Sequence, residues 1–248
     1  MPKRSDSWER RIQRAGELSE AHPFAREILD FYSGVARFQQ ELSARLDGAG
    51  ASDLEALLPA FPEFRCFMAN AAPEPLRERA AAVAGHEIEL LRAFWDGSGD
   101  LDPRDAFLAR AFLQPYAERR AAGAEVTAGG RLCPVCGRKP VAGVLREHMH
   151  GAARSLLCSL CSTEWGFDRS LCAGCGEDRP EGLAYFRSEQ FDNVRVDACS
   201  NCRAYLKTVD LTRNALAVPL VDEIAALPLD LWAQEQGYLK LERNLLGL

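Results

Sequence analysis

The sequence predicts a multidomain protein of the α plus small β class: an all-α N-terminal domain, two tandem rubredoxin-like or zinc-ribbon modules, and a short helical tail. Two observations lead to this prediction. Apolar side chains recur at helical spacing through the first half of the 248 residues, whereas eight of the nine cysteines form four Cys-x-x-Cys pairs in the second half. We expect the domains to span residues 1–125, 126–168, 169–213 and 214–248.

The first half shows the periodicity of packed helices. From Phe24 to Leu46 apolar residues are three or four positions apart, which places them on one face of a helix. Asp102 and Pro103 mark another helix start, because aspartate caps a helix and proline favours its first position; this helix should extend to about Ala121. The aromatic side chains of this half are interpreted as core residues. Further helical segments are expected near residues 53–58, 64–70 and 76–95.

The second half changes to short strands and turns and then returns to helix. Apolar runs at residues 141–145 and 155–157 are expected to form strands. Modules this small bury too little apolar surface to fold alone, so a bound metal would supply folding energy. In the tail, Pro228 occupies the first turn of an expected helix that should stop at Gly237.

The cysteine spacing predicts two metal sites. Two cysteines three positions apart on a tight turn can direct both sulfurs at one ion, and a second pair about twenty residues later completes a tetrahedral shell. A glycine follows each leading pair, and Trp165 and Tyr205 follow the closing pairs, where they can cover the sites. The expected ligands are Cys133, Cys136, Cys158 and Cys161 for the first site and Cys172, Cys175, Cys199 and Cys202 for the second.

The spacing leaves the pairing and the metal open. Sequential pairing is favoured, because only ten residues join Cys161 to Cys172 and the two modules must therefore lie side by side. Ligand spacing alone still allows an interleaved cross-brace, in which the first pair joins the third. Iron and zinc both accept four thiolates in a tetrahedron, so the sequence does not choose between them.

Disulfide formation and redox catalysis are the competing explanations of the cysteines. Residues 1–20 are polar and lack the apolar core of a secretory signal, and the apolar stretches fall short of the ~18 residues of a membrane span. We therefore expect a cytoplasmic protein with reduced thiols, in which the symmetric use of four pairs favours metal binding. The net charge of −6 argues against nucleic-acid binding, and the arginines of the metal region are interpreted as neutralising the thiolate sites.

No catalytic or cofactor-binding residues are expected, so the chain is not interpreted as an enzyme. Cys66 has no cysteine partner near it in sequence and is expected to be a buried structural thiol. His148 and His150 are interpreted as solvent-facing loop residues, because the first site already has four sulfurs. His22 and His86 lack a matching acid or nucleophile pattern.

Four cysteine runs and a C-terminal block without metal ligands carry a family resemblance. The runs lie at residues 133–137, 157–161, 172–176 and 199–202, and the block at residues 219–223, 229–231 and 234–238. Together they resemble the formate dehydrogenase accessory protein FdhE family over about residues 130–244.

This resemblance implies a cytoplasmic, chaperone-like maturation factor. Such a protein binds the catalytic subunit of a respiratory formate dehydrogenase, is required for the activity of that enzyme, and has no turnover of its own. The resemblance also implies iron in rubredoxin-like sites. Two other function classes stay open: a rubredoxin-like electron-transfer or thiol-redox protein, and a nucleic-acid-binding zinc-ribbon protein.

Overall fold

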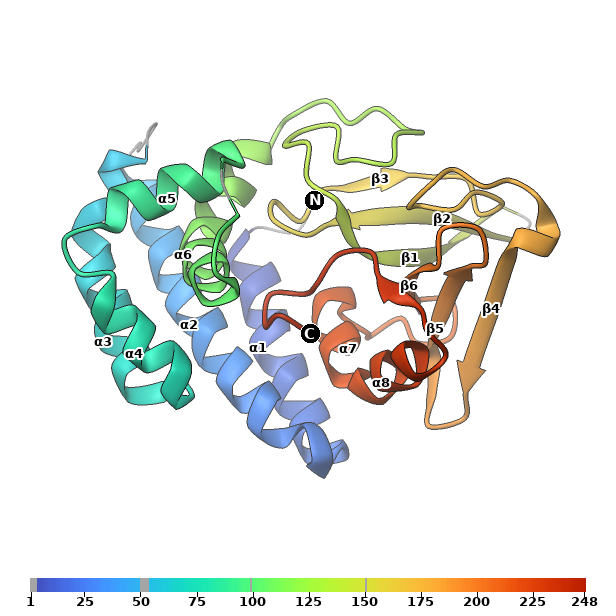
Figure 1. Cartoon of the computed structure of the whole chain (residues 1–248), viewed down its shortest axis with the longest axis horizontal. Coiled ribbons are helices and arrows are strands. Elements are labelled where there is room, and N and C mark those ends of the chain that lie inside the picture. The colour runs from blue at the N-terminus through green and yellow to red at the C-terminus, as the bar shows by residue number, and fades with distance from the viewer. Residues whose placement is uncertain (1–3, 50–53, 99, 150) are drawn as a thin grey trace.

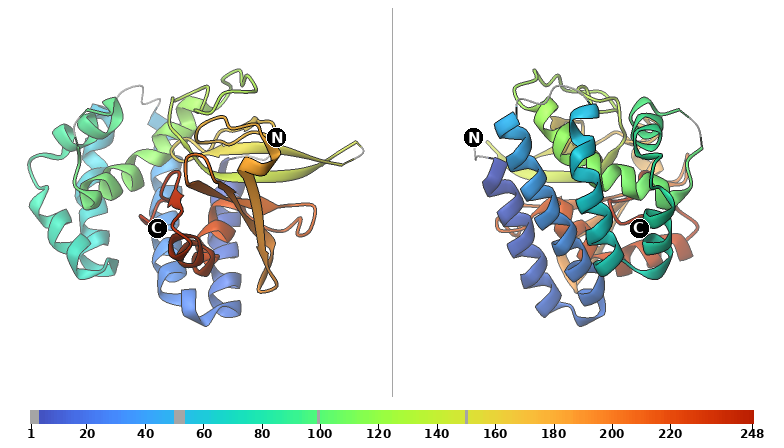
Figure 2. Two further views of the ribbon diagram at one scale, coloured as in Figure 1. Left: turned by 45° about the vertical axis from the view of Figure 1, so that its right-hand side comes forward. Right: turned by 90° about the vertical axis from the view of Figure 1, so that its left-hand side faces the viewer.

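Helices form the first half of the chain and a β-sheet occupies the second, which confirms the predicted fold class (Figure 1). The computed structural model describes residues 4–49, 54–98, 100–149 and 151–248. Helices α1 and α2 run side by side in Figure 2. The helical half comprises α1 (Arg4–Ala21), α2 (Arg26–Ala49), α3 (Phe61–Ala71), α4 (Glu74–Ala82), α5 (Glu87–Asp96) and α6 (Pro103–Ala121), with 3-10 turns η1 (Pro23–Ala25) and η2 (Glu55–Ala60).

Helix α6 is buried along most of its length and lies at the centre of the helical half. Asp102 caps it as expected, because its side chain accepts a hydrogen bond from the N–H of Arg104 at 2.8 Å. In the middle of the helix the ring of Phe112 packs edge-on against Phe61, with centroids 4.8 Å apart. Near its end, Ala117 packs against cysteines of the first metal module. Helix α6 therefore connects the helical core to the metal region.

Two features of the helical half differ from expectation. The single helix expected over residues 76–95 is wrong: the segment is divided into α4 and α5, and Gly85 between them has a φ of 82°, which interrupts the helix. Helix α1 was not expected, because its sequence is polar on average. Trp8, Ala15 and Leu18 nevertheless lie on one face at helical spacing, and all three are buried.

The other helical predictions are confirmed. The stretch from Phe24 to Leu46 forms η1 and α2, and its apolar side chains pack in the core except for Phe24, which is 48% exposed. Residues 64–70 lie in α3, while the segment near residues 53–58 begins outside the described residues and continues as η2. Among the described residues, no helix has both the length and the hydropathy needed to cross a bilayer.

The two metal modules form one continuous sheet. Its strand order is β3-β2-β1-β6-β5-β4, and β7 pairs with β6. Each module contains a cysteine pair, a hairpin, a second cysteine pair and a third strand, as a tandem repeat requires. The expected strands at residues 141–145 and 155–157 lie in β1 and β2. The strands are β1 (Pro140–His148), β2 (Gly151–Cys158), β3 (Glu164–Gly166), β4 (Leu183–Ser188), β5 (Phe191–Cys199), β6 (Ala204–Asp210) and β7 (Leu239–Lys240), with a 3-10 turn η3 (Pro180–Gly182).

Parallel pairing of β1 with β6 joins the modules. Gly143 pairs with Thr208 and Leu145 with Asp210 across this junction. A Cβ atom at position 143 would lie 2.2 Å from the Oγ1 atom of Thr208, so only glycine fits there. The close approach of the two backbones depends on this glycine.

The tail forms two helices, α7 (Pro219–Ala225) and α8 (Leu227–Glu235), which lie between the sheet and the helical half (Figure 1). Val221 and Ile224 of α7 pack in the helical core, whereas Leu229 of α8 packs against apolar residues of the sheet. The helix expected at Pro228 ends just before Gly237, which has a φ of 75°. The tail thus contacts both halves, and the domain boundaries given above stay a prediction.

Candidate metal centres

The first cluster brings four sulfurs to tetrahedral spacing. The Sγ atoms of Cys133 and Cys161 are 3.5 Å apart, and those of Cys136 and Cys158 are 3.3 Å apart. All four sulfurs lie within 4.8 Å of one another. A tetrahedral ion with bonds of about 2.3 Å to sulfur separates its ligands by about 3.8 Å. These four thiols can therefore close around one metal ion.

The second cluster repeats this geometry. The Sγ atoms of Cys172 and Cys202 are 3.7 Å apart, and those of Cys175 and Cys199 are 3.8 Å apart. All four again lie within 4.8 Å of one another, and all nine cysteines of the chain are free thiols. The cysteines are thus grouped sequentially, as the short linker favoured, and not as a cross-brace. Each cluster can hold one metal ion.

Left-handed turns give the four cysteine pairs a common shape. Gly137 and Gly176 follow the leading pairs with φ values of 72° and 82°, and each N–H donates to the carbonyl of the first cysteine of its pair at 2.9 Å. Ser162 and Arg203 occupy the equivalent positions after the closing pairs, at φ values of 53° and 58°. Such values are uncommon for residues with a side chain. The closing turns therefore hold a strained backbone where the sulfurs must converge.

The crowding of the thiols separates their pKa values. Hydrogen bonds with the other three thiols of its cluster hold the pKa of Cys133 far below the ordinary value, while contacts with the same cluster raise the pKa of Cys158 and Cys161. In the second cluster burial opposes ionisation, yet hydrogen bonds from the Glu177 backbone and neighbouring groups bring the pKa of Cys175 to about 7. Each cluster thus combines thiols that ionise easily with thiols that keep their protons, and a cation would replace those protons.

The helical half covers the first cluster. Cys133, Cys158 and Cys161 are buried and pack with Ala117 of α6 and with Trp165, whose Nε1 donates to a backbone carbonyl at 2.7 Å. Trp165 is therefore a cover of this site, as its position after the closing pair suggested. Cys136 is the exception, because this residue is partly exposed. Three of the four cysteines are thus buried.

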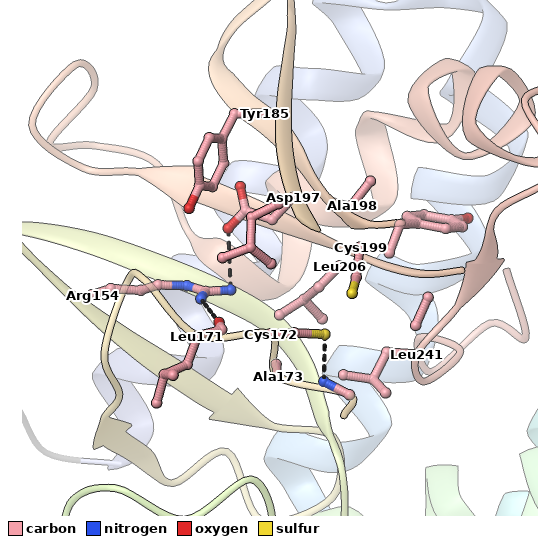
Figure 3. A pocket seen from close by; sticks show the side chains of 14 residues that line it. Arg154, Leu171, Cys172, Ala173, Tyr185, Asp197, Ala198, Cys199, Leu206 and Leu241 are labelled. Atoms are coloured by element: carbon pink, nitrogen blue, oxygen red, sulfur yellow. Dashed lines mark hydrogen bonds and ion pairs between the residues drawn. The ribbon is translucent and has the colours of Figure 1, made fainter. Parts of the chain in front are cut away.

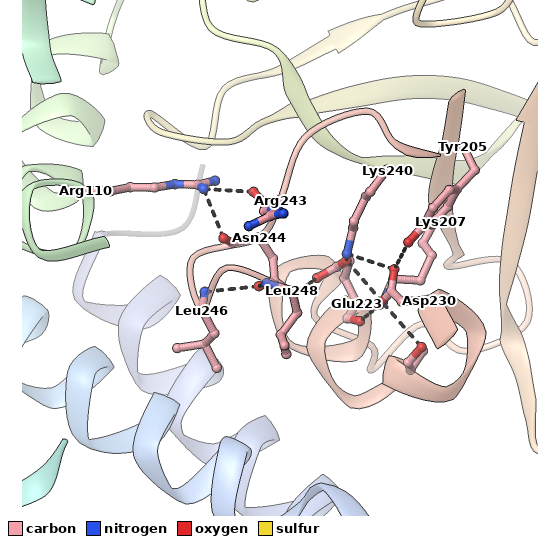
Figure 4. A network of polar contacts seen from close by, with 11 residues as sticks. Arg110, Tyr205, Lys207, Glu223, Asp230, Lys240, Arg243, Asn244, Leu246 and Leu248 are labelled. Carbon is pink, nitrogen blue, oxygen red and sulfur yellow. Dashed lines mark hydrogen bonds and ion pairs between the residues drawn. The ribbon is translucent and has the colours of Figure 1, made fainter. Parts of the chain in front are cut away.

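A buried arginine of α6 supports the same site. Arg110 is 8% exposed and donates two hydrogen bonds to the carbonyl of Ser159, inside the closing cysteine pair, at 2.8 and 3.1 Å. It also donates to the carbonyls of Arg243 and Asn244 at 2.8 and 3.0 Å (Figure 4). Burial lowers the pKa of Arg110, and the charge of Glu242 opposes that effect. One guanidinium therefore joins α6, the first site and the C-terminal segment.

The second cluster lies at the junction of the two modules, away from the helical half. Arg154 of β2 forms an ion pair with Asp197 of β5 at 3.1 Å and donates to the carbonyl of Leu171 at 3.1 Å (Figure 3). Beside this pair is an internal cavity of about 20 Å³ lined in part by Cys172 and Cys199. A space of that size holds a single water molecule at most. Ion pairing across the sheet, and not the helical core, thus supports this site.

Several arginines of the metal region have carboxylate partners, so ion pairing accounts for part of their charge. Neutralisation of the thiolate sites by the other arginines stays a prediction. The ion pairs are Arg146–Glu164, Arg154–Asp197, Arg179–Glu177, Arg187–Asp210 and Arg195–Asp197.

The other candidate residues lie outside both clusters. Cys66 is exposed on α3, so its expected burial is wrong. His148 is exposed at the end of β1, as expected for a residue outside the metal shell, and His150 lies outside the described residues. His22 and His86 precede η1 and α5 and belong to neither cluster. Among the described residues, the two cysteine clusters are the groups of side chains with metal-binding geometry.

A buried ionic network was missed by the sequence reading. Lys207 of β6 is fully buried and pairs with Glu223 of α7 at 3.1 Å and with Asp230 of α8 at 2.5 Å. Lys240 of β7 contacts the same two carboxylates, and Tyr205 donates to Asp230 at 2.8 Å (Figure 4). The signal was weak: a single lysine among apolar residues of a strand, with partners far away in sequence. The network fixes the tail helices on the second module.

Paired four-cysteine clusters on a duplicated ribbon, with a helical half over one of them, define a metal-binding protein with two thiolate sites. Family models named "FdhE, central domain" and "FdhE, C-terminal domain" match residues 132–169 and 171–246. The "Protein FdhE homolog" of Aquifex aeolicus is 31% identical over 95% of this chain and 94% of its own length. That of Pseudomonas aeruginosa is 32% identical over 97% of this chain and 90% of its own length.

The structural comparison agrees. The crystal structure of the FdhE protein from Pseudomonas aeruginosa superposes with a TM-score of 0.77 at 28% identity, over 99% of this chain and 96% of that one. The chain belongs to the FdhE family. The family assignment therefore includes the helical half, for which the sequence alone carried no diagnostic motif.

Proposed function

We propose that this protein is a cytoplasmic maturation factor that binds the catalytic subunit of a respiratory formate dehydrogenase and is required for the activity of that enzyme. The observation that carries the proposal is family membership over nearly the whole chain together with both cysteine clusters in metal-binding geometry. The protein acts by binding and has no turnover of its own.

In this proposal all eight clustered cysteines are ligands, four to each iron or zinc ion. The donor set fits either metal, because each cluster offers four thiols at tetrahedral spacing and, among the described residues, no oxygen or nitrogen ligand. When bound, the ions supply cross-links that hold the short strands of each module together. The chain's own contribution is to orient the thiols through the four left-handed turns and to shield those of the first site with Trp165, which is 1% exposed.

A deletion strain tests the function. Loss of the gene should abolish respiratory formate dehydrogenase activity while the catalytic subunit is still synthesised. A plasmid copy of the wild type should restore activity, and copies with Cys158→Ser or Cys199→Ser should not if the proposal needs both sites filled. Normal formate oxidation in a deletion strain without a paralogue would overturn the proposal. Elemental analysis of protein from its native host should find close to two equivalents of iron plus zinc.

A further inference from the structure

Two adjoining cavities lie between the helical half and the first metal module. One, of about 320 Å³, is lined by Trp95, Ala121, Arg120 and the partly exposed Cys136. The other, of about 360 Å³, extends under the C-terminal segment at residues 240–247. Arg138 and Leu160 line both cavities, so the two adjoin at these side chains as one composite surface. We call this the Cys136 groove.

The Cys136 groove gathers positive charge on an acidic molecule. Four guanidinium groups line it, and none has a carboxylate partner among the described residues, whereas the sheet arginines are ion-paired. Glu242 is the one acid in its lining. Even when a filled first site contributes its two negative charges, the groove stays positive, although the chain as a whole carries −6. The four guanidiniums belong to Arg110, Arg120, Arg138 and Arg243.

The four arginines differ in what they can offer a ligand. Arg110 is buried and holds carbonyls of the protein, and Arg138 donates to the carbonyls of Phe94 and Trp95. Arg120 and Arg243 are exposed, one in each cavity, with no ion-pair partner in the described part of the chain. The Nη1 atom of Arg120 donates to the Tyr116 hydroxyl at 3.2 Å, so Arg120 offers its remaining N–H groups in the smaller cavity, and Arg243 offers its guanidinium in the larger one.

Between these charges the walls are apolar. Trp95, Ala121 and Leu160 form the apolar part of the smaller cavity, and Phe107 and Leu245 that of the larger one. An occupant that matches both properties carries carboxylates next to apolar side chains. Apolar anchors in pockets with charged groups at the rim are the usual composition of a protein–protein contact.

We propose that the Cys136 groove binds an extended, acidic and apolar segment of the formate dehydrogenase catalytic subunit. This inference rests on the proposed function and names the surface and the partner chemistry. A segment bound there would contact the first metal site at Cys136, its partly exposed cysteine, and would touch the helical half at the same time. In this proposal the first metal site holds part of the groove wall in place, and binding of the segment requires no chemistry at the metal.

Charge reversal at the two exposed arginines tests the proposal. The full-length, metal-loaded chain would be titrated with purified catalytic subunit by biolayer interferometry. Arg120→Glu and Arg243→Glu should each raise the dissociation constant about tenfold, mainly by slowing association, because rim charges steer binding. Arg169→Glu is the matched control, since Arg169 is exposed and lines neither cavity. Metal content and circular dichroism should be unchanged in all three variants.

A second variant tests the apolar requirement without changing charge. Ala121→Phe should fill the smaller cavity and weaken binding about tenfold, with metal content preserved. Unchanged affinity in Arg120→Glu and Arg243→Glu, while the wild type binds, would overturn the groove proposal and leave the function intact. An equal loss in Arg169→Glu would overturn it too, because bulk charge would then explain binding. So would full competition by millimolar inorganic phosphate, which would indicate a small-anion site. A wild type that does not bind the subunit would contradict the proposed function itself.

Discussion

The two cysteine clusters have the same ligand geometry and different surroundings. The first is packed against α6 and held by Arg110, whereas the second is supported by ion pairs within the sheet and has two partly exposed cysteines, Cys175 and Cys202, where the first has one. The two copies of the module therefore have different structural roles. One copy packs against α6 at its cysteine site, whereas the other meets the helical half at Phe191, whose ring centroid lies 5.2 Å from that of His22. Loss of the metal from the first site should therefore destabilise more of the chain than loss of the metal from the second site.

The largest expected effect is a difference in which part of the chain unfolds when one site or the other is removed. Cys158→Ser should destabilise the helical half as well as the first module, because Ala117 and Arg110 of α6 lose their packing partners there. Cys199→Ser should unfold the second module and leave most of the helical signal. A structural site of four thiolates contributes on the order of 10 kcal/mol of apparent binding energy, which exceeds the stability of a small module.

Circular dichroism at 222 nm, read with metal content and thermal unfolding, would measure this difference. We expect one bound ion in each variant, with a lower helical signal only in Cys158→Ser. Equal helical signals in the two variants would contradict the predicted difference between the two sites. It would then follow that the helical half folds independently of both metals.

The buried ionic network should give the next largest effect, on the side of the second module. Removing one partner of a buried ion pair costs about 3–5 kcal/mol, because the remaining charge stays buried. Lys207→Met leaves the Glu223 and Asp230 carboxylates with Lys240 alone. The free energy of unfolding in urea should fall by that amount while both metals remain bound. Loss of metal from the first site in this variant would show that the two regions are more tightly coupled than their contacts suggest.

The same network predicts a pH dependence. Burial opposes ionisation of Glu223, but Lys207 and Lys240 outweigh it and lower its pKa to about 2. A depressed pKa in the folded state means that the stabilisation is complete above the unfolded value of about 4.5 and is lost as the pH falls toward 2. Its size is about 3 kcal/mol. Acid also releases thiolate-bound metal, so the measurement is the difference between wild type and Glu223→Gln over this range. The two stability curves should converge at the acid end.

Arg110 tests the coupling at the first site directly. Arg110→Met removes four hydrogen bonds from a charged donor to backbone carbonyls and should cost about 3 kcal/mol. The first site should lose its metal faster to a chromogenic chelator, while the rate at the second site stays unchanged. Arg110→Lys should recover part of the loss, since it keeps the charge without the fork of donors. Equal acceleration at both sites would mean that Arg110 acts on global stability.

The sequence predicted the clusters and missed what distinguishes them. Cysteine spacing is local, so all eight thiols followed from the motif. The glycines marked the two leading turns, whereas nothing marked the left-handed Ser162 and Arg203 of the closing turns. Arg110, Glu223 and Lys207 depend on contacts between segments far apart in the chain, and no periodicity marks them. Helix α1 was missed because its polar average hid an apolar stripe of three residues. The break at Gly85 was missed because the helix-forming composition around it hid one positive φ.

The smallest expected effect is a difference in thiol reactivity. Cys66 is exposed and belongs to neither cluster, so it should react with an alkylating reagent before any metal is removed. During mild chelation Cys175 should be labelled next, because it is partly exposed and its pKa of about 7 keeps much of it as the reactive thiolate at neutral pH. Cys133, Cys158 and Cys161 should follow roughly tenfold more slowly, since the helical half must first move away. Mass spectrometry of peptides from a labelling time course would give the order. Simultaneous labelling of both clusters would show that the packing of α6 over the first site does not slow labelling of its cysteines. The two sites would then differ only in how much they contribute to stability.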